Sequence, residues 1–333
     1  ADDSLFYPTA DGYAVGAYED VIDEVMAEAF VLYGNKAYAD ADEAIADGII
    51  IKIGKVGYKS LAEAVAAIPA NNNEVTIEFI DTGKEYKGSG IKVVADQNFV
   101  IDFNGNTYIV GSTVGSEGTE TNGFQLLKGS VVTMKNGTIK PGTDSAKILF
   151  QKYGDLTLTD ITIDATESNV QYVISNNCGT TTIAGETNIT AAEGWYAFDV
   201  YYWPSNGYTD GVEVVFDSTY TGTVKGQDEF TRDKSGQGDW LKNATLSVEP
   251  GCAGSFDIEF LPVENDSNFE ANISVGGGNF SIAIPAGYIA EGSVFYPTAD
   301  GYKVVEGTKI PADSVGVAEV DNAVYKTLQE AIY

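Results

Sequence analysis

The side chains best suited to holding a ligand lie in an aromatic segment, WYAFDVYYW at residues 195–203. As a strand, it would turn alternate side chains to opposite faces, with Tyr196, Phe198, Val200 and Tyr202 filling a core. The other face would carry two tryptophans and a tyrosine around one carboxylate, which suits sugar rings and protein partners. The predicted ligand-binding residues are therefore Trp195, Asp199, Tyr201, Trp203 and Tyr208. Alternatively, a loop at 204–210 or 226–240 covers this face.

A second candidate is an acidic loop, GQDEFTRDKSGQGDW at residues 226–240. Calcium favours oxygen ligands, so this loop is a calcium candidate, although its spacing matches no EF-hand. Arg232 and Lys234 lie among the acids, which favours a solvated acidic loop instead. No other cofactor is expected, and the candidate metal ligands are Asp228, Glu229, Asp233 and Asp239.

Two absences limit the catalytic chemistry open to the chain. It contains no histidine, and Arg232 is its single arginine. Ser-His-Asp and Cys-His mechanisms are therefore excluded. A glycosidase needs only two carboxylates, but 49 acidic residues would supply such pairs by chance. We therefore expect a protein that is not an enzyme, with a polysaccharide lyase or hydrolase as an alternative.

Cys178 and Cys252 are the two cysteines of the chain. They could form one disulfide, which would suit an oxidising compartment. Two buried thiols are the alternative, because the sequence does not show whether the two residues are close in space.

The charge balance points away from nucleic acid and membranes. The formal net charge is −30, so the chain would repel phosphates and anionic lipids. No apolar run is long enough to span a bilayer, and the start at Ala1 is typical of a mature or excised product. We expect an extracellular or cell-surface protein that does not insert into membranes.

An octapeptide, FYPTADGY, occurs at residues 6–13 and again at 295–302. Residues 31–45 also align without a gap to residues 318–332. The chain therefore carries two copies of a small α+β unit, at 1–48 and 290–333, as in a tandem array. The residues expected to contact a neighbouring module or subunit are Phe6, Tyr7, Tyr13, Phe295, Tyr296 and Tyr302.

Short helices are predicted within and next to these units. Residues 18–30 have a helical spacing of apolar side chains, with acids near the start. Ser60 with Glu63, and Thr327 with Glu330, match the S/T-x-x-E capping box. We expect each box to begin a short amphipathic helix that follows a strand.

Between the units, many short alternating strands are separated by Gly, Asn and Asp. Aligning them places the apolar residues Phe103, Met134, Leu158 and Ile183 at matching positions, roughly 24 residues apart. The longer first interval is attributed to a loop at 111–123. Such a repeat favours stacked coils that share one core over a β-sandwich, because sandwich strands do not repeat one another.

The strands VVTMKNGTIK (131–140) and LTLTDITID (156–164), preceded by the helix SLAEAVAAI (60–68), resemble the right-handed parallel β-helix family with the pectate-lyase-like fold. The resemblance implies a β-helix of about nine coils over residues 49–289, capped at its N-terminal end by a helix. It does not specify activity, because this fold carries lyases, hydrolases, adhesins and phage spikes. The tandem units look like those of large repetitive bacterial surface proteins of the adhesin type.

These features predict a non-enzymatic, adhesin-like surface module that holds a host protein or glycan on a rigid stalk. A structural alternative is a subunit of a filament or surface layer, whose copies assemble head-to-tail through the 290–333 and 1–48 units. The enzymatic alternative is a polysaccharide lyase or hydrolase.

Overall fold

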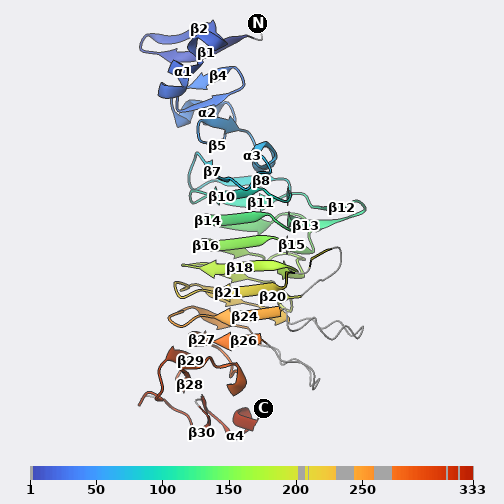
Figure 1. Ribbon diagram of the computed structural model, residues 1–333, viewed down its shortest axis with the longest axis vertical. Helices are drawn as coiled ribbons and strands as arrows, with labels where there is room; N and C mark the ends of the chain where they lie inside the picture. The colour runs from blue at the N-terminus through green and yellow to red at the C-terminus, as the bar shows by residue number, and fades with distance from the viewer. Residues whose placement is uncertain are drawn as a thin grey trace.

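The computed structural model describes residues 3–201, 207–208, 210–229, 244–258, 272–312, 314–321 and 323–332. The chain is mainly β, with parallel strands in its sheets, as the composition predicts. Figure 1 shows the strands as successive layers along the long axis, with the two termini at opposite ends. Backbone hydrogen bonds between layers therefore run along the length of the molecule.

The first series of stacked strands forms one face of the larger sheet. Each strand of this series pairs in parallel with the next member of the series. The series is β7 (Glu74–Phe79), β10 (Asn98–Asp102), β14 (Val131–Pro141), β16 (Asp155–Asp164), β18 (Gly179–Ala184), β21 (Val212–Phe216), β24 (Ala244–Val248) and β26 (Asn272–Val275).

A second parallel series forms another face of the same sheet. Strands β14 and β16 belong to both series, because each is long enough to pair at both ends. The other members are β8 (Glu85–Gly88), β11 (Thr107–Val110), β19 (Asn188–Thr190), β22 (Thr223–Lys225), β25 (Ser255–Asp257) and β27 (Gly278–Phe280).

A smaller sheet supplies a further face, also mainly parallel. Its strands are β9 (Ile91–Val93), β12 (Val114–Ser116), β13 (Thr119–Leu126), β15 (Ile148–Lys152), β17 (Tyr172–Asn176), β20 (Tyr196–Val200) and β23 (Gln227–Glu229). The loop predicted at 111–123 is wrong in part, because β12 and β13 pair as an antiparallel hairpin there. Thr113 Oγ1 donates to the carbonyl of Glu120 at 2.6 Å and stabilises this hairpin.

The predicted alignment of apolar residues is confirmed at three of its four positions. Met134 pairs with Leu158, and Leu158 pairs with Ile183. The prediction for Phe103 is wrong, because Ile101 is the residue opposite Met134. The turn from β10 to β11 holds more residues than the bend within β14, and Phe103 lies in this turn. All these side chains are buried in one continuous apolar cluster.

We call the three series of parallel strands together, residues 74–280, the stack. At the N-terminal end, three antiparallel hairpins precede the stack. They are β1 (Ser4–Thr9) with β2 (Gly12–Ala17), β3 (Val31–Tyr33) with β4 (Lys36–Tyr38), and β5 (Ile51–Ile53) with β6 (Val56–Tyr58). Each is followed by a helix: α1 (Tyr18–Glu28), α2 (Ala41–Ala46) and α3 (Leu61–Ala67). Strand β5 pairs antiparallel with β7 and so joins this segment to the stack.

At the C-terminal end, a short 3-10 turn, η3 (Ala286–Tyr288), leads into two hairpins and a helix. These are β28 (Ser293–Thr298) with β29 (Gly301–Glu306), β30 (Ala318–Val320) with β31 (Ala323–Tyr325), and α4 (Leu328–Ile332). Phe295 pairs in parallel with Ala323, as Phe6 pairs with Lys36 at the other end. The two copies predicted from the octapeptide therefore share the strand pairings within the unit.

The predicted capping boxes are present. The Ser60 hydroxyl accepts from the Glu63 amide at 3.2 Å, at the start of α3. At α4 the bonds are reciprocal, because the Glu330 amide donates to Thr327 Oγ1 and the Thr327 amide donates to Glu330 Oε2. These bonds satisfy amides that have no partner within the helix.

Candidate functional site

The face predicted to bind a ligand lies on β20. Phe198 and Val200 are buried in the core, as the alternation predicts. Asp199 points to the opposite face, yet only 5% of its surface is exposed. The expectation of an exposed carboxylate at this position is therefore wrong, and both faces of β20 are closed to solvent here.

Asp199 instead holds neighbouring strands together. Its carboxylate accepts from Ser175 Oγ at 2.9 Å and from the Asn176 amide at 2.6 Å. The Asn176 side chain in turn donates to the carbonyl of Asp199 at 2.7 Å. A buried charge requires such hydrogen bonds to offset its lost hydration. We assign Asp199 to the structure of the sheet.

A buried lysine, which the sequence did not single out, lies near this carboxylate. Lys152 is fully buried, and its ammonium nitrogen donates to the carbonyl of Gly179 at 2.7 Å. Burial lowers the pKa of Lys152 to about 7, although the nearby carboxylates Asp155, Asp199 and Glu213 oppose this shift. Lys152 lies opposite Leu126 in the row that Val93 begins, so only its position in the register reveals it.

Tyr208, another predicted ligand contact, differs from Asp199 because it packs against a second aromatic ring. Tyr208 stacks on Tyr153, with ring centroids 4.4 Å apart. The loop carrying Tyr208 is tied down by Lys128, which donates to the carbonyl of Gly207 at 2.8 Å and pairs with Asp210 at 2.7 Å. Both tyrosines are half-buried, so this pair is a preformed aromatic surface.

Of the remaining aromatic candidates, Tyr201 is close enough to Tyr153 to interact with it electrostatically. Tyr201 is half-buried and packs against the core. Trp195 precedes β20 and is half-buried, and Trp203 lies outside the described residues. Tyr196, predicted to face the core, stacks instead on Tyr172 of the adjacent strand, with centroids 4.9 Å apart.

The predicted metal ligands lie mostly outside the described residues, whereas both cysteines are described. Of the calcium candidates, Asp233 and Asp239 lie outside the described residues, as do the side chains of Asp228 and Glu229. Within the described ranges, no group of three or more potential ligand side chains could hold a metal ion. The two cysteines are both buried and free, so the disulfide alternative is wrong and the alternative of two buried thiols is confirmed.

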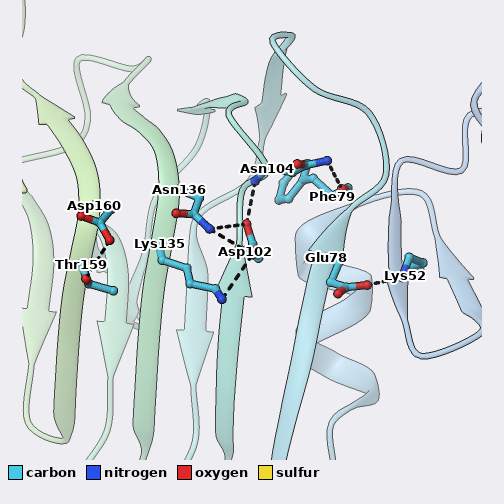
Figure 2. Close-up of polar contacts among 9 residues, drawn as sticks. All are labelled: Lys52, Glu78, Phe79, Asp102, Asn104, Lys135, Asn136, Thr159 and Asp160. Atoms are coloured by element: carbon cyan, nitrogen blue, oxygen red, sulfur yellow. Dashed lines mark hydrogen bonds and ion pairs between the residues drawn. The ribbon is translucent and has the colours of Figure 1, made fainter. Parts of the chain in front are cut away.

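A ladder of charged and polar side chains crosses the larger sheet (Figure 2). Strand pairing places Lys52, Glu78, Asp102, Lys135 and Thr159 in one row. Lys52 pairs with Glu78, and the Lys135 ammonium lies 3.3 Å from Asp102. Partly exposed pairs of this kind contribute at most about 1 kcal/mol each. Each carboxylate of the row has a lysine on one side, which offsets the like charges of Glu78 and Asp102 that face each other between them.

The same ladder borders a corner of the stack where the backbone turns (Figure 2). Asn104, Asn136 and Asp160 have φ angles of 50°, 58° and 52°, a left-handed conformation that Asn and Asp tolerate best among residues with a side chain. Asn136 Nδ2 donates to Asp102 Oδ2 at 3.1 Å, and the Asn104 amide donates to Asp102 Oδ1 at 2.9 Å. The polar residues at this corner therefore shape the backbone and are occupied by structural contacts.

An open groove of about 720 Å³ crosses the edges of several layers. Its wall includes the ion pair of Lys225 with Asp257, whose charged atoms lie 3.8 Å apart and are largely exposed. Glu193 and Gln227 add polar groups to the lining. Both acidic side chains of this wall, Glu193 and Asp257, are exposed to solvent.

The C-terminal unit contacts the end of the stack through both backbone hydrogen bonds and apolar packing. Strand β29 pairs antiparallel with β27, the last strand of its series, through Gly278 with Val304 and Phe280 with Tyr302. Phe295, Tyr302 and Val304 belong to the same apolar cluster as the stack. The Tyr325 hydroxyl also donates to the carbonyl of Ile284 at 3.1 Å. The second octapeptide therefore closes the C-terminal end of the stack.

The sequence predicts Phe295, Tyr296 and Tyr302 as inter-module contacts, but it does not predict which face of the hairpin each one uses. Phe295 and Tyr302 contact the stack, whereas Tyr296 belongs to a separate small cluster with Val294. The alternation within FYPTADGY contains this signal, because adjacent strand residues point to opposite faces.

Comparison with protein family models, with curated proteins and with solved structures finds no match to the chain. Among the described residues, no helix has the length and apolar character that crossing a membrane requires.

Proposed function

We propose that this chain is a non-enzymatic structural unit of an elongated extracellular array, folded as a right-handed parallel β-helix. Parallel pairing between successive strands, with Met134, Leu158 and Ile183 in one buried row, supports the β-helix. Each coil would bury its apolar face only against its neighbours, so the fold lengthens along one axis.

The observation that carries the array is the docking of the C-terminal repeat unit on the end of the stack. Strand β29 continues the hydrogen bonding of β27, and three side chains of the hairpin enter the main core. A joint that shares both backbone bonds and core packing resists bending more than a flexible linker does. The repeat unit thus acts as a rigid coupling between successive stacks.

The state of the polar residues supports a structural role. Asp199, the carboxylate expected at a binding face, is engaged by Ser175 and Asn176. Asp102 is engaged by Lys135 and Asn136 at the corner of the sheet. These acids are occupied in holding strands, which leaves them unsuited to work as a paired acid and base on a glycan.

The experiment is a fusion in which residues 1–289 are followed directly by residues 1–333, so that the second copy's first unit replaces the unit at 290–333. Electron microscopy of single particles should show straight rods about twice as long as the single chain. A control fusion carries a flexible Gly-Ser linker between the two copies, and should bend at its centre. A direct fusion that bends as freely as the control contradicts the proposal.

A second candidate function, adhesin-like binding of a host glycan or protein, is favoured by the stacked pair Tyr153 and Tyr208. Aromatic faces held in place bind sugar rings with little loss of conformational entropy. Tyr208→Ala should abolish binding to a glycan panel or to host cells, while Tyr172→Ala serves as a matched control at another stacked pair. Equal binding by both variants would exclude this pair as the ligand site.

A further inference from the structure

The two octapeptide hairpins have the same internal structure. Phe6 pairs with Val15 as Phe295 pairs with Val304, each across its own hairpin. The aromatic rings of Phe6 and Tyr13 stack at 4.5 Å, and those of the second copy stack at 5.1 Å. The hydroxyl of the tyrosine bonds a helix glutamate in both copies. The hairpin is therefore a preformed element that does not depend on its neighbour for its shape.

The environments of the two copies are opposite. Phe6 is 37% exposed and Val15 is 67% exposed, whereas Phe295 and Val304 are 0% and 1% exposed. The tyrosines differ in the same way, at 38% for Tyr13 and 4% for its counterpart. We call Phe6, Tyr13 and Val15 the open face of the N-terminal hairpin. A cluster of exposed aromatic and aliphatic side chains on one sheet face is typical of an interaction surface.

The two hairpins also differ in the number of strands that pair with them. Strand β2 pairs with β1, and no other strand of the described ranges pairs with it. Its counterpart β29 pairs with both β28 and β27. An edge strand with free amides and carbonyls is a ready template for a further strand. The open face and the open edge therefore lie on the same element.

The C-terminal copy shows what fits this surface. There, β27 lies against the edge, and the rings of Phe256 and Phe280 stack at 4.9 Å beneath the hairpin. The approach is close, because a Cβ on Gly301 would lie 2.4 Å from the carbonyl oxygen of Phe280. Gly12, at the matching place, has nothing within 4 Å. The turn needs Gly12 for its φ of 125°, but the space beside it is open, whereas β27 fills that space in the C-terminal copy.

We propose that the open face of the N-terminal hairpin docks on the last coil of a second copy of this stack that precedes it in the array, one whose β27 is not covered by a C-terminal unit of its own as it is in this chain. β2 would pair antiparallel with the partner's strand equivalent to β27. The register follows from the C-terminal copy, with Gly278 opposite Val15, Asn279 opposite Ala14 and Phe280 opposite Tyr13. Phe6, Tyr13 and Val15 would then be buried as their counterparts are. This inference rests on the proposed array function and specifies its joint.

The identity of the octapeptide is the reason to commit to this occupant. A surface that only needed solubility would not keep two aromatic rings and a valine outward. A glycan would use the ring faces, but would not account for the open strand edge. Strand addition uses both, because backbone bonds supply affinity and alternate side chains supply specificity.

The register is tested by cross-linking in the fusion of residues 1–289 with 1–333, with Cys178→Ala and Cys252→Ala in both copies. Asn279→Cys in the first copy is combined with Ala14→Cys in the second, and a short bifunctional thiol reagent is added. The positive control is the single full chain with Asn279→Cys and Lys303→Cys, whose residues already pair. We expect the fusion to cross-link within about an order of magnitude of the control rate, since paired residues have Cβ atoms about 5 Å apart.

Two further variants decide the outcome. Ala10→Cys replaces Ala14→Cys and places the thiol in the hairpin turn, where cross-linking should be lost. Val15→Asp in the cross-linking fusion should slow the reaction at least roughly tenfold, because it would bury a charge. In the single chain, Val15→Asp should leave the melting temperature unchanged, which shows that the hairpin still folds. A fusion that fails to cross-link while the control reacts, or that is insensitive to Val15→Asp, overturns the proposed docking.

These results are separable from the array proposal. Straight rods without the Asn279–Ala14 cross-link would retain the array and reject this joint. Cross-linked fusions that bend freely at the centre would retain the joint and reject the rigid array.

Discussion

Tyr302 stacks on Phe295 with its ring plane only 7° from parallel, inside the main core of the protein. The same two residue types stack at the N-terminus, where the pair is exposed. An identical octapeptide thus occupies two environments in one chain. Local sequence determines the hairpin and the ring stacking, while the neighbouring strand determines burial.

Replacing the two equivalent glycines, Gly12 and Gly301, should distinguish the cost of a strained backbone from the cost of a clash with β27. Gly12→Ala and Gly301→Ala both place a side chain at a positive φ, which costs about 1 kcal/mol. Gly301→Ala adds a clash with the carbonyl of Phe280, so we expect roughly 2–4 kcal/mol of destabilisation there. Chemical denaturation followed by circular dichroism measures both. Equal losses would show that the C-terminal hairpin is not held tightly against β27.

Two buried tyrosines should respond differently to loss of the hydroxyl. The Tyr220 hydroxyl is buried and has no hydrogen-bond partner among the residues that the structure describes, whereas the Tyr325 hydroxyl donates to the carbonyl of Ile284. Tyr220→Phe should be neutral or stabilise by about 1 kcal/mol, because an unsatisfied polar atom is removed. Tyr325→Phe should cost about 1 kcal/mol. Thermal melting of the pair provides the comparison, and a larger loss at Tyr220 would reveal a partner for its hydroxyl.

The two thiols should be inert in the native protein. Both cysteines are buried and free, and burial raises the pKa of Cys252 to about 11. Since the thiolate is the reactive form, a thiol reagent at pH 7–8 should label neither residue until denaturant is added. A reducing agent should leave the melting temperature unchanged. Rapid labelling of the folded chain, or a reductant-sensitive melting transition, would contradict this assignment.

Much of the larger sheet could be predicted from sequence because its strands alternate regularly. Thr-x-Thr and apolar-x-apolar patterns at 155–164 place Leu158 correctly opposite Met134. Phe103 was placed wrongly because an apolar residue in a turn looks the same as one in a strand. Only the strand pairing, which places Ile101 opposite Met134, distinguishes the residue in the turn from the residue in the strand.

The smaller sheet is harder to predict from the sequence, for a different physical reason. Its strands β15 and β17 are buried on both faces, so they do not alternate between apolar and polar residues. The buried polar residues, such as Lys152 and Asn176, look like surface positions in the sequence. Burial of Asp199 could not be predicted, because its partners Ser175 and Asn176 come from the neighbouring strand β17.

Lys152 should make stability depend on pH in a defined window. Its folded pKa of about 7 lies below the ordinary value of 10.5, so the unfolded chain binds more protons between these values. Stability therefore rises as pH increases above 7, and the full cost of burying the charge is present below pH 7. From pH 7 to 9 the gain should be on the order of 2 kcal/mol, and Lys152→Met should abolish it.

The measurement is the free energy of unfolding at pH 6, 7, 8 and 9 for the native sequence and Lys152→Met. Staying below pH 10 avoids the buried tyrosines, whose raised pKa values would reduce stability at higher pH. Lys128→Met is the matched control, because Lys128 is partly exposed and paired with Asp210. Its curve should run parallel to that of the native sequence. Parallel curves for Lys152→Met as well would mean that Lys152 keeps its proton in the folded chain up to its ordinary pKa, despite its burial.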